Sequence, residues 1–424
     1  MKPNMKPSRT TLASLSLLTT IALANDPADN ATLDQDAAVM AGSQDTWTGI
    51  RQWIGSGQAY IMLRTRFESV DQDGFTADAH ALTIRTLLGY QLGNYGKISG
   101  ALEFEDVRAI GNGRYNSTDN GVIDRPVVAD PEGGEVTQAF MTYAFSDTLT
   151  AKVGRQRMIL DNARFIGNVG WRQNEQTFDA AALVGQPVGG VHMVYAYVQN
   201  TNRISEESSS AGNFGSESHV LNLSHDFDGI GKLTAYAYWL DLASAVNSTD
   251  TFGVRFTGKH NISDDTHLLY SLELAQQEDA GDNPNNVDAG YMMAEVGVAL
   301  DAVTIKVGAE ILEGGAADGA FITPLATLHA FNGWADQFLM TPATGLEDAY
   351  VAVSGKVADV SLMGVFHDFS SESASSDWGT ELDFQAKYPL KEGLDVGAKY
   401  ADFSSKDAGF ADTTKMWLWV AMSF

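Results

Sequence analysis

Apolar and polar residues alternate one by one in many short segments of this chain, from Gly57 to its last residue. In the first segment, Ala59, Ile61, Leu63, Thr65 and Phe67 alternate with Tyr60, Met62, Arg64, Arg66 and Glu68. Successive side chains of a β-strand point to opposite faces. A period of two therefore predicts strands with one apolar and one polar face.

The links between these segments indicate how the strands are arranged. Alternation alone would also fit a soluble β-sandwich. Here tight turns, such as Ser146-Asp147, largely alternate with longer polar loops, such as Asp106–Gly134. This arrangement is typical of bacterial outer-membrane barrels. We predict an all-β fold, a transmembrane antiparallel β-barrel of about 18 strands with short periplasmic turns and long extracellular loops. The strands are expected to begin near Gly57, His80, Lys97, Val136, Leu149, Glu175, Val191, His219, Lys232, Thr251, Thr266, Val287, Val303, Asp348, Val360, Gly379, Gly393 and Lys415.

The first 56 residues lack this alternation. Three basic residues precede an apolar run, Thr11–Leu23, and an Ala-x-Ala site ends at Ala24. The run is too short to span a bilayer, and the whole pattern is typical of a cleaved secretory signal peptide. We predict a signal peptide at 1–24, a periplasmic tail with one short helix at 25–56, and the barrel at 57–424.

The composition suits an exported, strand-rich protein. The chain has 41 Gly, 10 Pro and no Cys, so it cannot be braced by disulfides. Without the three basic residues of the signal peptide, 24 Lys and Arg would stand against 54 Asp and Glu, a net charge near −30. Such a chain repels polyanions, and we expect no nucleic-acid partner.

The last predicted strand ends the chain at Phe424. Met416, Leu418, Val420 and Met422 share its face, beside Trp417 and Trp419. A terminal Phe on an amphipathic strand resembles the signal by which outer-membrane barrels are handed to the barrel-assembly machinery. The expected partners are therefore this machinery, outer-membrane lipid and lipopolysaccharide.

Charged residues of both signs have the parity of the lumen face. A barrel of ~16–18 strands leaves an aqueous channel that such residues would line. They could simply hydrate the wall, as in any porin, or opposed rows of charge could narrow and orient the path. The predicted pore-lining residues are Arg64, Arg66, Arg85, Lys97, Glu103, Glu105 and Lys152.

One long loop, Met158–Asn174, is rich in groups that bind. Loops on rigid strands often carry function, although an ordinary solvated loop anchored by a Trp would look similar. We predict that this loop folds into the lumen and, with Arg64, Arg66 and Arg85 facing Glu103 and Glu105, forms the narrowest part of the path. Its candidate constriction residues are Asp161, Asn162, Arg164, Trp171, Arg172 and Gln173.

Two arginines beside this loop have the parity of the lipid face. Arg155 and Arg157 share the register of Val153. Either both reach lipopolysaccharide phosphates at the outer rim, or a bulge at Gly154 turns them inward. The sequence leaves both possibilities open.

A second long loop, Gly314–Leu346, contains too many large apolar residues to extend into water. Loops of this kind usually form lids or plugs, so we expect it to fold inward or to pack across the mouth. His329, Trp334 and Asp336 could contact a solute there, or could only pin this loop to the first.

The same segments carry a family resemblance. GRQRMILDN, RFIGNVGWRQNEQTFDA and TPLATLHAFNGWADQFLMTP resemble the two signature segments of the alginate export family of bacterial outer-membrane β-barrels. With the strand pattern, the resemblance covers residues 57–424. It implies the barrel fold, whereas family members include one polysaccharide exporter and many barrels that look like general porins.

A catalytic barrel is the rival class. His225-Asp226 and His367-Asp368 are adjacent His-Asp pairs, but the chain has no Gly-x-Ser-x-Gly, no His-Glu-x-x-His and no Cys nucleophile. We expect no enzyme, no cofactor and no metal; the acidic segment Asp279–Asp288 lacks the spacing of an EF-hand.

We predict a porin that passes small hydrophilic solutes across the outer membrane of a Gram-negative bacterium. Export of an anionic polysaccharide such as alginate is the alternative, and a surface receptor or adhesin is a third class. A polyanion exporter should offer a predominantly basic path. The mixed lumen charges of this chain favour small solutes over a polysaccharide.

Overall fold

The computed structural model describes residues 47–111, 113–205, 209, 211–315 and 319–424. The chain forms two units, Met1–Gln52 and Trp53–Phe424. Residues 47–55 are helical, which matches the short helix predicted for the tail. The predicted signal peptide and tail residues 25–46 lie outside the described residues. No helix in the described ranges is long and apolar enough to cross a bilayer.

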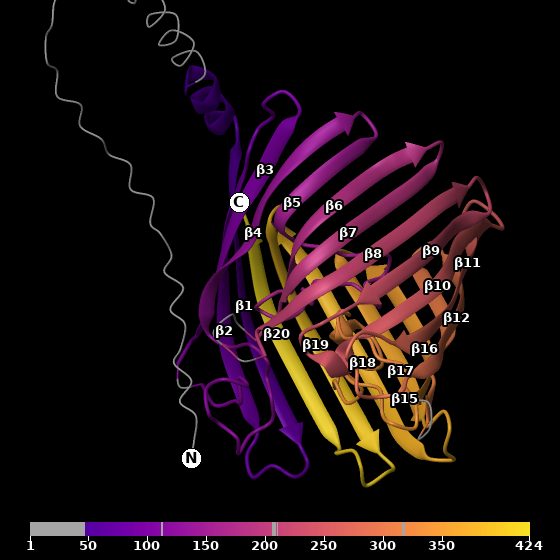
Figure 1. Cartoon of the computed structure of the whole chain (residues 1–424). Coiled ribbons are helices and arrows are strands. Elements are labelled where there is room, and N and C mark those ends of the chain that lie inside the picture. The colour runs from indigo at the N-terminus through magenta and orange to yellow at the C-terminus, as the bar shows by residue number, and fades with distance from the viewer. Residues whose placement is uncertain (1–46, 112, 206–208, 210, 316–318) are drawn as a thin grey trace, which may run out of the picture. The chain divides into compact units, whose positions relative to one another are not determined.

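The second unit is a closed antiparallel barrel of 18 strands (Figure 1). Each strand pairs with the next, and β1 pairs with β20, placing Phe67 opposite Leu418. Closure leaves no free sheet edge, as a bilayer requires. The predicted fold class and strand number are therefore confirmed. The barrel strands are β1 (Gln58–Gln72), β2 (Ala79–Gln91), β3 (Ile98–Ala109), β4 (Gly133–Ser146), β5 (Leu149–Gln156), β6 (Thr177–Val188), β7 (Val191–Asn202), β8 (Asn213–Phe227), β9 (Gly231–Leu240), β10 (Thr249–Asn261), β11 (Thr266–Asp279), β12 (Asp288–Leu300), β13 (Val303–Leu312), β16 (Leu346–Val357), β17 (Val360–Ser370), β18 (Asp377–Lys391), β19 (Leu394–Ser405) and β20 (Thr413–Ser423).

Short turns and longer loops alternate around the barrel. Two-residue turns at 147–148 and 358–359 lie at one end, and the loops at 110–132, 157–176 and 313–345 start from the other. The last of these loops carries the small pair β14 (Gly314–Gly315) and β15 (Gly319–Ala320), and the 3-10 turn η2 (Leu328–Ala330). Another such turn, η1 (Ala245–Asn247), lies between β9 and β10.

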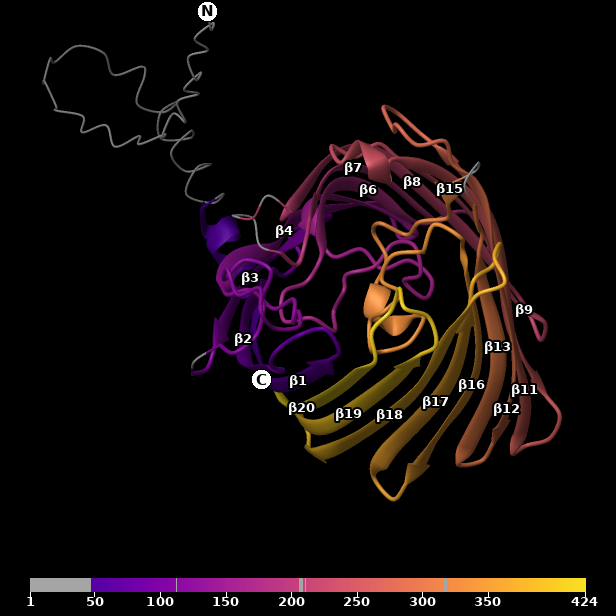
Figure 2. The same cartoon turned by 90° about the horizontal axis from the view of Figure 1, so that it is seen from below.

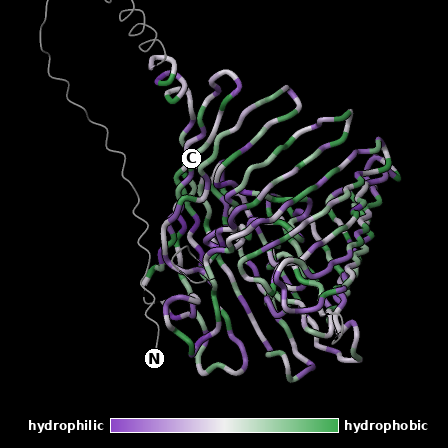
Figure 3. Tube along the Cα trace, viewed as in Figure 1, coloured by the Kyte–Doolittle hydropathy of each residue, from purple (hydrophilic) through white to green (hydrophobic). Residues whose placement is uncertain are grey.

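Exposure alternates along the strands as the sequence predicts. On β20, Met416, Leu418 and Val420 are 40, 48 and 41% exposed, whereas Trp417 between them is fully buried. Figure 3 shows the corresponding alternation of apolar and polar residues along the strands. The exposed apolar face is the surface that a bilayer covers, and the other face lines the lumen.

The orientation of the barrel can be tested on whole cells, since the chain has no Cys of its own. We expect cysteines at Asp119 and Asp282, both exposed on the long-loop side, to react with an impermeant thiol reagent. A cysteine at Asp264, in a short turn, should react only after lysis. Asp282 is preferred to its neighbour Gly281, whose φ of +55° favours glycine. Labelling at Asp264 alone would invert the assignment.

The C-terminal residue continues the seam between β20 and β1. Phe424 and Ile61 exchange backbone hydrogen bonds of 2.9 and 3.2 Å, while the Phe424 residue stays 75% exposed. We expect deletion of Phe424 to lower the amount of heat-modifiable folded barrel, with unchanged conductance of the barrels that do fold. Phe424→Tyr, which keeps an aromatic end, should restore the yield. A normal yield after deletion would mean that the terminal ring is incidental to assembly.

Candidate functional site: two loops folded into the lumen

Residues 157–176, the first inward loop, leave β5 and enter the lumen (Figure 2). Near its start, the Asp161 carboxylate accepts a 2.6 Å hydrogen bond from Asn222 on β8. Arg164 then donates to Glu310 on β13 at 2.7 Å, and both residues are buried. The loop therefore crosses the lumen and is attached to distant parts of the wall.

The other end of the first inward loop is fastened to β1 and β2. Gln173 donates from Nε2 to Thr83 at 2.8 Å and accepts at Oε1 from Arg64 at 3.0 Å. Arg64 also donates to the carbonyls of Gly170 and Arg172. These amide and carbonyl acceptors are neutral, so the hydrogen bonds to them add no counter-charge for Arg64.

Residues 313–345, the second inward loop, pack against the first. The backbone amide of Gly167 donates to the Leu325 carbonyl, and that of Thr327 donates to Ala163, both at 2.9 Å. Phe165 inserts its ring among Tyr236, Tyr291 and Phe321, with ring centroids 5.2–5.8 Å apart. The loops thus form one packed body inside the barrel, and the second loop lies inward as the sequence indicates.

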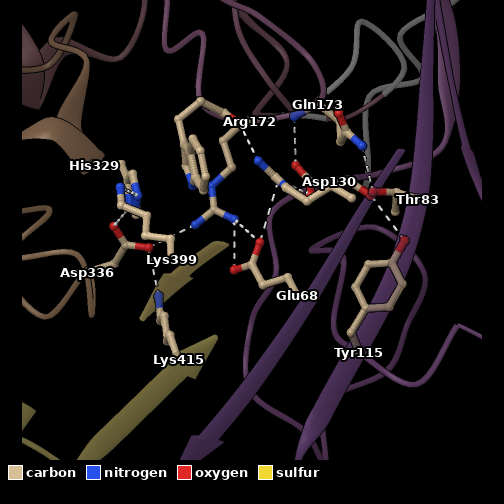
Figure 4. Close-up of polar contacts among 12 residues, drawn as sticks. Glu68, Thr83, Tyr115, Asp130, Arg172, Gln173, His329, Asp336, Lys399 and Lys415 are labelled. Carbon is tan, nitrogen blue, oxygen red and sulfur yellow. Dashed lines mark hydrogen bonds and ion pairs between the residues drawn. The ribbon is translucent and has the colours of Figure 1, made fainter. Parts of the chain in front are cut away.

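An ion-pair network joins the loops to β1 and β20 (Figure 4). Arg172 lies between two carboxylates, 3.2 Å from Glu68 and 2.9 Å from Asp336. Asp336 also accepts from Lys415 on β20 at 2.7 Å. All four side chains are at most 7% exposed. Asp336 therefore holds together cations from a loop and from a strand.

Arg66 extends this network on β1. It pairs with Asp130, from the loop at 110–132, and lies 3.5 Å from Glu68. It also donates to the carbonyl of Trp171. Its guanidinium lies 5.0 Å from the centroid of that indole, a cation–π geometry. A third loop thus contributes a carboxylate to the lumen centre.

His329 is fixed in one tautomer by its neighbours. Its Nδ1 lies 2.7 Å from Asp336, and its Nε2 lies 2.8 Å from the Lys399 ammonium. An ammonium can only donate, so Nε2 accepts and Nδ1 carries the proton. The ring stacks on Trp171 at 5.1 Å. The histidine is therefore neutral and bridges an acid and a base.

Burial and the Lys399 charge lower the pKa of His329 to about 3, despite the attraction of Asp336. Burial alone would raise the pKa of Asp336, but His329, Lys415 and Arg172 outweigh it and hold that pKa well below its usual range. Both groups therefore keep these charge states across physiological pH.

The lowered pKa of His329 predicts a pH effect on stability. Below pH ~6.5 the histidine gains a proton in the unfolded chain but not in the folded one, so stability falls as the pH drops. Between pH 7.5 and 5, the wild type should lose roughly 2 kcal/mol more than His329→Gln, which retains a donor and an acceptor. Urea unfolding of both proteins at the two pH values measures this difference. Equal losses would show that His329 titrates normally.

The structure places the predicted pore-lining residues in different surroundings. Of the three arginines expected to face Glu103 and Glu105, Arg85 contacts Glu105 and lies 3.3 Å from Glu175. Arg64 is bonded to the first inward loop and Arg66 to Asp130 instead. Lys152 lies over the ring of Phe140 at 3.8 Å. Lys97 was expected on a strand, but it lies in the turn before β3, where its ammonium donates to a backbone carbonyl at 3.0 Å. Lys97 precedes Ile98, the first paired residue of β3, so the alternation of a strand does not determine the direction of its side chain.

The two arginines at the start of the first inward loop separate, which neither alternative anticipated. Arg157 pairs with Glu103 at 2.7 Å and with Glu175, so it points into the lumen. Arg155 keeps the strand register and pairs with Asp179 at 2.8 Å. No register shift occurs at Gly154. Arg157 turns inward because β5 ends one residue earlier, and no bulge is involved.

In both adjacent His-Asp pairs, the histidine bonds to a group other than the neighbouring aspartate. His367 bonds to Asp348 at 2.8 Å, and His225 bonds to the carbonyl of Gly190 at 2.9 Å. Within the described part of the chain, no three His, Cys, Asp or Glu side chains are arranged to hold a metal ion.

Sequence reasoning missed two members of the network. Asp130 lies in an irregular loop, and nothing periodic marks it. Lys415 was detectable, because it shares the inward register of Trp417 on the last strand. His329 and Asp336 do meet the first inward loop, where His329 stacks on Trp171 and Asp336 pairs with Arg172. Trp334 instead meets the wall, where its backbone amide donates to Asp383 on β18 and the Lys399 ammonium lies 3.6 Å from its ring centroid.

Two cavities flank the segment 328–337. The outer cavity, of about 270 Å³, is lined by Leu328, His329, Ala335 and Asp336, with Lys415 and an apolar rim. The inner cavity, of about 310 Å³, is lined by residues 330–334 and by the middle of β10–β13, β16 and β17. The second inward loop therefore forms a partition between two small spaces.

The protein-family model for alginate export matches residues 58–311, well over half of the chain. The chain belongs to the alginate export family. No curated protein sequence matches it. With the closed barrel and its apolar outer face, family membership places this alginate export family member in the outer membrane of a Gram-negative bacterium.

Solved outer-membrane channels share the fold of this family member at low sequence identity. OccAB4 of Acinetobacter baumannii has a TM-score of 0.68 and 13% identity, covering 87% of this chain and 98% of that one. OccAB2 of the same species has a TM-score of 0.69 and 15% identity, with 88% and 98% covered. OpdK of Pseudomonas aeruginosa, solved with vanillate, has 0.66 and 14%, with 88% and 99% covered. At these identities the likeness concerns the fold.

Proposed function

We propose that this barrel is a channel for small hydrophilic solutes, narrowed by the two inward loops. The observation that carries the proposal is the division of a wide lumen into cavities of about 270 and 310 Å³. One of these spaces lies just below and the other at the lower end of the range for small-molecule sites, roughly 300–1,000 Å³. A small solute fits either space.

The charges along the path also favour small solutes over a polyanion. Arg66, Arg172 and Lys415 are each paired with a carboxylate, so they offer little free positive charge to a polyuronate. The neighbour OpdK was solved with vanillate, a small organic acid, which agrees with a small-solute channel in this architecture. Polysaccharide export remains the second candidate, supported by the family name alone.

Conductance of the purified barrel in planar bilayers tests the proposal. We expect a small, stable single-channel conductance, and swelling of proteoliposomes in small sugars and amino acids that decreases steeply with solute size. Arg64→Ala should shift ion preference toward cations, because this arginine makes its hydrogen bonds to neutral groups. Lys356→Ala, at an exposed ion pair, serves as the charge-matched control. A folded barrel with no conductance would overturn the channel assignment.

A further inference from the structure

The charged groups that line the inner cavity all have partners of opposite charge. Arg255 pairs with Glu273, Lys306 pairs with Glu295 at 2.9 Å, and Arg164 pairs with Glu310 at 2.7 Å. His367 is likewise bonded to Asp348. A charged solute would have to displace one of these partners. The cavity therefore favours a neutral ligand.

Polar groups of this cavity are suited to hydroxyl groups. The Ser271 hydroxyl lines the cavity, is 7% exposed as a residue, and has no hydrogen-bond partner. Buried polar atoms normally have partners, so an orphan hydroxyl facing a cavity points to a ligand or water that supplies one. The Tyr350 hydroxyl on the same lining donates to Glu295 at 2.9 Å and can still accept a hydrogen bond from a ligand. Hydroxyls both donate and accept, which matches this mixed set.

Aromatic rings complete the lining. Phe331 and Tyr350, both half-buried, and the more buried Trp334 come from the second inward loop and from β16. Aromatic faces offer flat apolar surface, on which the C–H face of a sugar ring packs. Paired charges, an orphan hydroxyl and aromatic faces in one cavity together describe a carbohydrate site.

We propose that the inner cavity binds a neutral mono- or disaccharide as it passes through the barrel; this rests on the proposed channel function. The volume of about 310 Å³ admits one or two sugar rings at a time. Selection against acidic sugars follows because the cations on the cavity wall, Arg255 and Lys306, are already paired with Glu273 and Glu295. The site would thus bind maltose or glucose in preference to glucuronate.

Current interruptions in planar bilayers test this site. Maltose and glucose should interrupt the single-channel current, whereas glucuronate at the same concentration should do so at least several-fold less. Phe331→Ala should weaken the maltose effect roughly tenfold, as loss of an aromatic contact does, and Ser271→Ala should weaken it to a smaller extent. Matched controls are Ser224→Ala, at an inward-facing serine outside the cavity lining, and Phe366→Ala, at an exposed ring on the apolar outer face. Both should leave the maltose effect unchanged.

Saturation-transfer NMR with the detergent-solubilised barrel and maltose gives a readout that does not need conduction. Magnetisation transfer to maltose that is weaker in Phe331→Ala than in the wild type supports the site. If this result comes with no measurable current, only the proposed channel function fails. A conducting barrel with neither current interruption nor transfer would overturn the sugar site and leave the channel intact. Equal effects of glucuronate and glucose would overturn the selection for neutral sugars.

Discussion

Deleting residues 162–169 should raise the single-channel conductance severalfold. The deletion removes Arg164, Phe165 and Ile166, which lie at the centre of the contact between the two inward loops. Without them the first inward loop loses its attachment to β13, and the second loses the surface on which it packs. A barrel of ~16–18 strands is wide enough for an aqueous channel once its loops no longer fill it.

The control is a second loop deletion, the removal of residues 281–286 from the exposed loop between β11 and β12. It should leave conductance unchanged. Heat-modifiable migration on gels must confirm that both variants are folded. If the folded 162–169 deletion conducts like the wild type, the narrowest point lies elsewhere, most directly in the second inward loop.

Replacing Asp336 with Asn should destabilise the interior by roughly 3–5 kcal/mol. The change removes one negative charge and leaves Arg172 and Lys415 buried without their shared partner. A buried cation that loses its partner is strongly unfavourable. Asn is the right replacement, since it tolerates the φ of +62° that Asp336 adopts, which Ala would strain.

Urea unfolding in detergent measures this loss, and Asp359→Asn is the matched control. Asp359 pairs with Lys356 at 3.8 Å in an exposed turn, and such pairs contribute at most about 1 kcal/mol. Because the pKa of Asp336 lies well below its usual range, its contribution persists above pH ~4 and is lost only as the pH falls further. Equal stability of the two variants at pH 7 would show that Asp336 is not the centre of the network.

The fold was accessible from the sequence because a barrel wall has only two environments. Residues such as Leu418 and Trp417 face lipid or lumen by parity, and every strand repeats the rule. Loop lengths then settle the end at which each link lies. Neither step needs knowledge of distant contacts, so strand number and pairing follow from local pattern alone.

The interior was less accessible, because parity ends where a strand ends. Arg157 leaves its strand register after Gln156 and meets Glu103, a partner that no spacing indicates. Asp130 reaches Arg66 from an irregular loop. The concentration of binding groups in the first inward loop did mark the right segment, since Trp171 and Arg172 lie at the centre of the network. Composition thus marked the loop that enters the lumen, but only three-dimensional packing assigned the partners.

The network has a consequence for the order of assembly. Its contacts join residues far apart in the chain, such as Arg164 with Glu310, 146 positions away, and Arg172 with Asp336, 164 positions away. Lys415, which completes the set, lies on β20, the strand that closes the barrel against β1. Contacts of such long sequence separation form slowly, because the chain must first close large loops. The interior is therefore completed only after the final strand has joined the first, so that a chain truncated before β20 would expose its buried charges and be recognisable as unfinished.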